Sequence, residues 1–345
     1  MDYSLSDPLV LSASGVIEAN GGSSLSAAAL ANPHGLAMEV TEIRWRLAPK
    51  SPTQNDQFEA TGQSIAMKLD LGQAAIVGEQ VPVGLFGSFR DSSEFAAEIY
   101  GLDLQEPTVT VQPTSYFWRP RHPIFVPANQ ILTPSFEHMG QIGLPYQLDL
   151  IYIGRTLPPD YKPGSIMLPW VSAWNFQSFQ QISGGLGGSG LSSELTLNNP
   201  FGVPMKIAKL TGRCALINAS SSGGFTNYAT EELFQFRQRL AALRIRSSKG
   251  EDVVRTQTSF DGLFPYGWRE WDIEGEWMMR PGEFYKARLD VANVDFAITE
   301  SFNGRVQFSV GLMGYRKVPV NALADPSIVA ATAATAAAPA AGSAS

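Results

Sequence analysis

The sequence predicts an all-β protein that contains two tandem copies of one antiparallel domain. Three observations carry this prediction: an ordered set of repeated segments, a proline-rich stretch between the two sets, and a composition that suits strands joined by turns. Of 345 residues, 44% are hydrophobic, and there are 32 glycines, 23 prolines and 19 phenylalanines. Such a chain can form a sizeable core, and its glycines and prolines can supply many turns.

The clearest repeat is an Asn-Pro-x-Gly segment, found at Asn32–Gly35 and again at Asn199–Gly202. Over nine residues (32–40 and 199–207) four positions are identical, and the offset is 167 residues. Each segment follows a Gly/Ser-rich stretch and leads into a strand-like run. The pattern predicts the same corner and the same following strand in both copies.

A second repeat predicts the last strand of each copy. Gln147–Gly154 matches Gln307–Gly314 at an offset of 160 residues, and Leu148, Leu150 and Tyr152 alternate as in a half-buried strand. Segment 122–132 aligns loosely with 280–291.

A short helix is predicted in each copy, over 91–101 in the first and over 230–246 in the second. Asp91 is a suitable N-cap with Glu94 three residues later, and Leu233, Phe236, Leu240 and Leu243 share one helical face.

The domain boundaries follow from the proline-rich stretch Leu157–Gly164, which can form neither a helix nor a central strand. We expect a first domain over 8–157, a linker over 158–164, a second domain over 165–319, and a low-complexity, alanine-rich tail over 320–345. About 150 residues of short β-runs with one helix insertion suit an eight-stranded antiparallel jelly-roll sandwich in each copy.

Charge and ligand chemistry argue against several function classes. The net charge of −7 disfavours a nucleic-acid-coating protein. The three histidines, His34, His122 and His138, do not form the paired-histidine motif of a two-barrel metalloenzyme, and we expect no metal and no cofactor. The one cysteine, Cys214, lies in an apolar run and is expected to be a buried core residue. The N-terminal residues do not resemble a signal peptide, so we expect synthesis in the cytoplasm.

Carboxylates provide the one enzymatic alternative. Asp272, Glu274 and Glu276 stand at alternate positions between Trp271 and Trp277, so a regular strand would place all three on one face. Paired acids beside aromatic residues are typical of sugar-cleaving clefts. A solvated strand face is the alternative interpretation and the one we favour, so no catalytic residue is assigned.

The paired Asn-Pro-x-Gly segments, the two closing strands (147–154 and 307–314) and the linker together resemble the double jelly-roll major capsid proteins of membrane-containing icosahedral bacteriophages. The resemblance covers about 310 residues and is architectural. It implies a non-enzymatic protein of the virion, assembled in the host cytoplasm, that forms homotrimers with a pseudo-hexameric outline.

The partners implied are neighbouring capsid trimers, penton or minor capsid proteins, and an internal lipid membrane where the virus has one. No direct sequence-specific binding of nucleic acid is expected. Two alternatives stay open: another virion protein, such as a spike, tail or carbohydrate-binding protein, and a jelly-roll glycan hydrolase that uses Asp272, Glu274 or Glu276.

Overall fold

The structure of the protein is a computed structural model. The described residues are 7–17, 30–31, 35–49, 65–72, 74–89, 114–128, 130–138, 146–182, 191–220, 241–264, 270–291 and 302–324.

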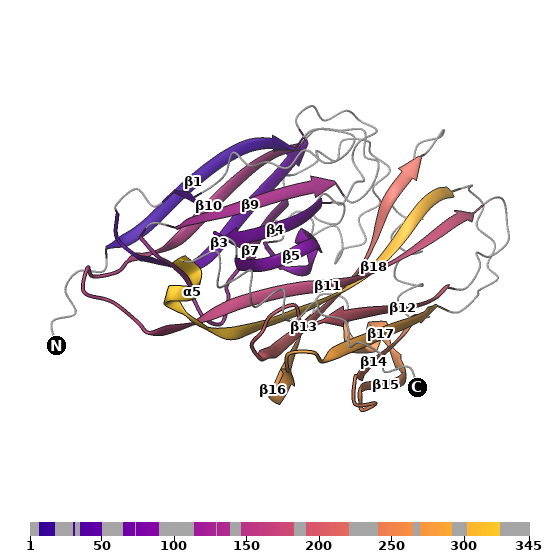
Figure 1. The fold of residues 1–345 in the computed structure, drawn as a ribbon. Coiled ribbons are helices and arrows are strands. Elements are labelled where there is room, and N and C mark those ends of the chain that lie inside the picture. Colours follow the sequence, from indigo (N-terminus) through magenta and orange to yellow (C-terminus); the bar gives the residue numbers. More distant parts are fainter. Residues whose placement is uncertain are drawn as a thin grey trace, which may run out of the picture.

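The first copy forms a sandwich of two sheet layers (Figure 1). One layer has the strand order β1-β10-β3-β7-β6, with β8 also paired to β3, and the other has the order β5-β4-β9-β2. Its elements are β1 (Pro8–Ile17), β2 (Leu30–Ala31), β3 (Met38–Pro49), β4 (Ile65–Leu71), β5 (Ala74–Pro82), the 3-10 helix η2 (Val83–Leu85), β6 (Gly87–Phe89), β7 (Thr114–Trp118), β8 (Ile124–Val126), β9 (Ile131–His138) and β10 (Tyr146–Thr156).

The second copy repeats this arrangement, and its strands β11, β13 and β18 are longer than their counterparts β1, β3 and β10. One layer has the order β16-β13-β18-β11 and the other β12-β17-β14-β15. Its elements are β11 (Ser165–Ile182), β12 (Leu191–Asn198), β13 (Met205–Ser220), β14 (Ala241–Ser247), β15 (Asp252–Ser259), α4 (Phe260–Leu263), β16 (Glu270–Met279), β17 (Phe284–Val291), β18 (Phe302–Pro319) and α5 (Val320–Ala324).

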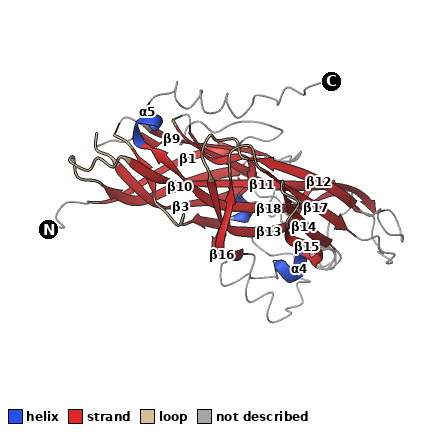
Figure 2. Ribbon diagram, turned by 60° about the horizontal axis from the view of Figure 1, so that its bottom comes forward, coloured by secondary structure: helices blue, strands red, loops and turns tan. Residues whose placement is uncertain are grey.

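The two copies have the same strand connectivity. The order β1-β10-β3 corresponds to β11-β18-β13, and the order β2-β9-β4-β5 corresponds to β12-β17-β14-β15. This is the jelly-roll pattern, in which the chain passes between two facing sheets. The predicted fold class, all-β with two tandem jelly-roll sandwiches, is therefore confirmed, and strands dominate the view in Figure 2.

Strand register confirms the repeat in detail. Gln147 pairs with Ala48, and Gln307 pairs with Ala215, so both predicted closing strands lie against the strand that follows the Asn-Pro-x-Gly segment. Seven residues later Gly154 pairs with Val40 and Gly314 pairs with Ile207.

Each of these glycines lies opposite a β-bulge. An added Cβ would lie within 2 Å of a backbone oxygen, that of Glu39 beside Gly154 and that of Lys206 beside Gly314. Only glycine allows the two strands to approach so closely in each copy.

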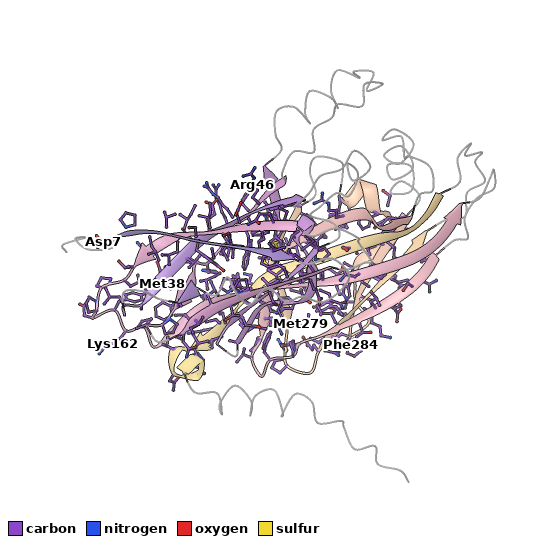
Figure 3. The ribbon with its side chains drawn as sticks, turned by 90° about the horizontal axis from the view of Figure 1, so that it is seen from above. Asp7, Met38, Arg46, Lys162, Met279 and Phe284 are labelled. Carbon is purple, nitrogen blue, oxygen red and sulfur yellow. The ribbon has the colours of Figure 1, made fainter. Side chains whose placement is uncertain are left out.

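Alternating burial explains why these segments form strands. Leu148, Leu150 and Tyr152 on β10 are buried as predicted, each facing the first core. On β14, Ala241, Leu243 and Ile245 alternate in the same way toward the second core. Figure 3 shows side chains packed along both copies. Each large apolar side chain buried in this way contributes about 1.5–3 kcal/mol.

The helix prediction is contradicted over 241–246 and is not tested over the rest of the two predicted ranges. The short helix of each copy follows the fifth strand, as η2 after β5 and as α4 after β15. Ser259 caps α4 by accepting a hydrogen bond from the Gly262 amide. The predicted helix over 230–246 is contradicted at its end, because 241–246 belong to β14. Residues 91–101 and 230–240 lie outside the described residues.

Two further predictions need adjustment. β9 begins at Ile131 and its counterpart β17 begins at Phe284, so the loose alignment of 122–132 with 280–291 is displaced by five residues. The tail predicted over 320–345 begins as helix α5, which buries Leu323 in the core of the first copy. Figure 1 shows α5 beside the strands of that copy.

The proline-rich segment 157–164 forms no helix or strand and connects β10 to β11. It is anchored at both ends: the Leu157 amide donates to the Ala37 carbonyl, and the Val320 amide donates to the Gly164 carbonyl. Among the described helices, none is long and apolar enough to cross a membrane.

Candidate functional site: the junction between the two copies

Strand β11 joins the two sandwiches because its two faces serve different cores. Trp170 and Trp174 are buried in the second core, whereas Val171 is buried in the first. Val171 also pairs in parallel with Val77 of β5, which makes one sheet run from the second copy into the first. β11 and β18 extend beneath the first sandwich in Figure 1.

Side-chain hydrogen bonds secure the contact between β11 and β5. The Asn175 amide nitrogen donates to the Gln80 carbonyl at 2.7 Å. The Ser309 hydroxyl donates to the Asn175 side-chain oxygen at 2.8 Å and so orients that amide. Gln80 has a φ of 56°, a left-handed conformation that non-glycine residues seldom adopt.

Arg316 places a positive charge at the same junction. The residue is 4% exposed, and its guanidinium lies 3.3 Å from the centre of the Phe201 ring in the second copy. Its Nη2 donates to the Ala75 carbonyl of the first copy at 2.9 Å, while Nη1 has no hydrogen-bond partner among the described atoms. Burial lowers the pKa of Arg316 to about 9. One cation therefore bridges the two sandwiches through a ring and a carbonyl.

The repeated corner motif has a structural role. Asn199 is 3% exposed, and its side-chain nitrogen donates to the carbonyls of Val203 and Met279, each at 2.9 Å. Its side-chain oxygen accepts from the Phe201 amide at 2.8 Å, which positions Phe201 beneath Arg316. The corresponding Asn32 lies outside the described residues.

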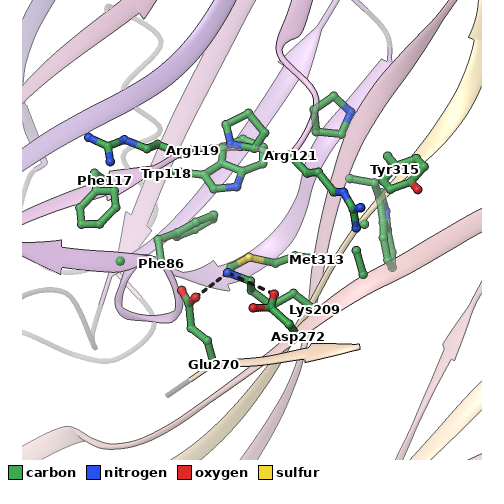
Figure 4. A pocket seen from close by; sticks show the side chains of 16 residues that line it. Phe86, Phe117, Trp118, Arg119, Arg121, Lys209, Glu270, Asp272, Met313 and Tyr315 are labelled. Carbon is green, nitrogen blue, oxygen red and sulfur yellow. Dashed lines mark hydrogen bonds and ion pairs between the residues drawn. The ribbon is translucent and has the colours of Figure 1, made fainter. Parts of the chain in front are cut away.

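A cleft of about 440 Å³ opens between the two copies beside this junction (Figure 4). The first copy contributes Phe86, Trp118, Arg119 and Arg121, and the second contributes Lys209, Glu270, Asp272, Met313 and Tyr315. Lys209 forms ion pairs with Glu270 at 2.5 Å and with Asp272 at 3.7 Å. The walls thus carry both charge signs and several aromatic side chains.

The three predicted carboxylates lie on β16, but not as a regular row on one face. Asp272 pairs with Lys209 and Trp277 with Ile207, so β16 bulges between these pairs, and Gly275 there has a φ of 97°. Asp272 has a side chain that is 82% exposed, and Glu274 is exposed as well. The Glu276 side chain lies outside the described residues. Sugar cleavage uses two carboxyl groups that flank the bond to be broken, and the two carboxylates described here, Asp272 and Glu274, are both exposed on a bulged strand.

His122 is the one histidine whose side chain the structure describes. The His122 ring packs edge-on against Tyr315 with centroids 4.4 Å apart, and burial together with the charge of Arg121 lowers the pKa of His122. The side chains of His34, His138 and Cys214 lie outside the described residues. Among the described residues, no three potential metal ligands lie together.

The sequence did not predict that Arg316 and Asn175 form contacts between the two copies. An arginine that follows the predicted closing strand of each copy, Arg155 and Arg316, was the available signal, but the partners of Arg316 are distant in sequence.

No family model matches the sequence, and no curated protein matches it. Solved structures with a similar fold include viral capsid proteins. A chain of the PBCV-1 virus capsid has 9% sequence identity to this chain. The alignment covers 92% of this chain and 95% of the capsid chain, with a TM-score of 0.49. The major capsid protein P2 of bacteriophage PM2 is 11% identical, with 90% and 98% covered and a TM-score of 0.36. The Sulfolobus Turreted Icosahedral Virus structure is 12% identical, with 96% and 97% covered and a TM-score of 0.39.

Proposed function

We propose that this chain is a structural capsid protein that forms pseudo-hexameric homotrimers and tiles an icosahedral virion shell, without enzymatic activity. The observation that carries the proposal is the pair of sandwiches with the same strand connectivity, held side by side through β11 and β5. Jelly rolls are common building blocks of viral shells.

The physical reason for a trimer is that one type of contact can be used repeatedly. Three chains with two similar sandwiches each present six similar lateral faces, so nearly the same contact can repeat around the ring. A block with that outline fills a plane as a true hexamer would. The repeating units in this proposal are residues 8–157 and 165–319, connected by the linker 158–164.

The proposed partners follow from the same assembly. Neighbouring trimers meet at the lateral faces, and penton or minor capsid proteins fill the positions where six-sided blocks cannot. Where the virus has an internal lipid membrane beneath the shell, that membrane is a further partner, and no sequence-specific contact with the genome is proposed. The location is the virion, after assembly in the host cytoplasm.

Electron microscopy of the purified full chain in negative stain tests the proposal, together with mass determination by light scattering. We expect flat particles with a six-lobed outline and a mass three times the 37.3 kDa of one chain. Slender particles would instead favour a spike or tail protein. A stable monomer under all salt conditions tested would refute the assembly.

The hydrolase alternative has its own test. Purified protein is incubated with a panel of glycans, and the Asp272→Asn and Glu274→Gln variants serve as controls. We expect no turnover by any of the three proteins. Turnover by the original chain that is lost in either variant would overturn the non-enzymatic assignment.

A further inference from the structure

Equivalent residues of the two copies can be assigned from the bulges. Gly154 and Gly314 lie opposite the same irregularity, and on the neighbouring first strands they pair with Leu9 and Trp170 respectively. The next residues, Val10 on β1 and Val171 on β11, are therefore equivalent.

The fifth strands, β5 and β15, can be aligned in the same way. The pairing of β4 with β5 shifts register twice, on either side of the pair Leu69–Val77. The pairing of β14 with β15 also shifts twice, on either side of the pair Ile245–Val254. Val77 and Val254 are therefore equivalent.

These two alignments show that equivalent strand edges are covered in one copy and uncovered in the other. Within the chain, the first strand of the second copy (β11) contacts the fifth strand of the first copy (β5), with Val171 paired to Val77. The counterparts are β1 of the first copy and β15 of the second, and each is the last strand of its sheet among the strands that the structure describes. Val171 is fully buried, whereas Val10 is 66% exposed.

The outer edge of β1 also carries no charged side chain. None of the ten residues of β1 is charged, and its outward positions Val10, Ser12 and Ser14 are exposed. Native proteins commonly protect such an edge with charges or cover it, because its free backbone groups can pair with another strand. On β11 the corresponding positions are Val171, Ala173 and Asn175, which contact the first copy.

We propose that β1 of one chain pairs in parallel with β15 of a second copy of this chain, with Val10 opposite Val254. The partner is a second copy because the contact between β11 and β5 already shows how these two strand types fit. A contact of this kind is head-to-tail, so it forms a ring when the rotation closes and a filament when it does not. One part of this inference rests on the proposed function, namely that the ring closes at three chains.

Engineered cysteines test the register directly. In a Cys214→Ser background, the variant Val10→Cys/Val254→Cys is oxidised and analysed on a denaturing, non-reducing gel. Paired strand residues lie about 4.8 Å apart, within the range that a disulfide spans. The matched control is Val77→Cys/Val171→Cys, which should form its disulfide within one chain. Each single-cysteine variant shows the background of random cross-linking.

We expect covalent dimers and trimers from the Val10/Val254 pair, with no larger ring, and only monomers of altered mobility from the control. If the control forms its disulfide and native trimers assemble, but the Val10/Val254 pair stays monomeric, the β1–β15 contact is wrong and the capsid proposal survives. If the gel shows covalent oligomers larger than trimers in a continuing series, the contact is right and the closed trimer is wrong. If the protein is monomeric in its native state and does not cross-link, both are wrong.

A second variant tests the same contact without cysteines. Val10→Asp should raise the protein concentration needed for half-maximal assembly by about tenfold or more, because it places an unpaired charge in the contact. Ile131→Asp is the control, since Ile131 is also an exposed strand residue (47%). It lies on β9, and the equivalent residue of the second copy, Phe284, lies on β17. Both strands have a neighbour on each side, so neither is the end strand of its sheet. An equal effect of both substitutions would count against the assigned surface.

Discussion

At the scale of single residues, two glycines determine how closely the central strands of each copy approach. We predict that Gly314→Ala and Gly154→Ala each destabilise the fold by about 3 kcal/mol or more, because the new methyl group would collide with the backbone of β13 or β3. Chemical denaturation measures the loss. Gly164→Ala is the matched control, since no atom lies within 4 Å of its Cβ position, and a loss of similar size there would contradict the explanation.

His122 makes a pH-dependent contribution at the junction. Burial and Arg121 lower the pKa of His122 below its ordinary 6.5, so the unfolded chain binds a proton more readily than the folded chain. The fold therefore loses stability as the pH falls below 6.5 toward the folded-state pKa.

We predict that His122→Phe, which keeps an aromatic ring against Tyr315, reduces the drop in melting temperature between pH 7 and pH 5. Differential scanning calorimetry at both pH values provides the measurement. Arg121→Gln should reduce the drop to a smaller extent. An unchanged drop in the phenylalanine variant would show that other groups dominate acid sensitivity.

At the scale of elements, the corner after β12 depends on one buried amide. Asn199 makes three side-chain hydrogen bonds that close the turn and hold Phe201 in place. Asn199→Ala should cost about 2–3 kcal/mol, because buried backbone groups lose their partners. The neighbouring Asn198 is exposed, and Asn198→Ala should change the free energy of unfolding by less than about 0.5 kcal/mol. Equal effects of the two substitutions would remove the argument for the corner.

The helix prediction shows how a local pattern can mislead. Leu240 and Leu243 fit a helical face, yet Leu243 lies on β14 and shares its buried face with Ala241 and Ile245. A short apolar run is compatible with both periods. The pairing of β14 with β15 on one side and β17 on the other decides in favour of a strand.

At the scale of the whole molecule, the chain returns to the first copy after its last strand. Helix α5 buries Leu323 in the first core, although it follows the last strand of the second copy. We predict that deletion of 325–345 leaves the melting temperature nearly unchanged but weakens assembly of the shell. Deletion of 320–345 should also lower stability by about 2 kcal/mol or more, because a buried leucine is lost.

Calorimetry and electron microscopy of both truncated chains provide the test. Full assembly of the shorter deletion would mean that the tail has no role between neighbours. Failure of that deletion to fold would instead place residues after 324 in a core.

The sequence by itself determined that the chain is β-rich and duplicated. Alternation such as Leu148, Leu150 and Tyr152, and repeats such as Asn199 or Gly314, are encoded in short segments, so they can be recognised without a structure. Only the tertiary structure decided how the copies join. Arg316 reaches the Ala75 carbonyl across 241 residues of sequence, and Asn175 reaches Gln80 across 95. No local period encodes such pairs, because they depend on which outer faces the two finished sandwiches bury against each other.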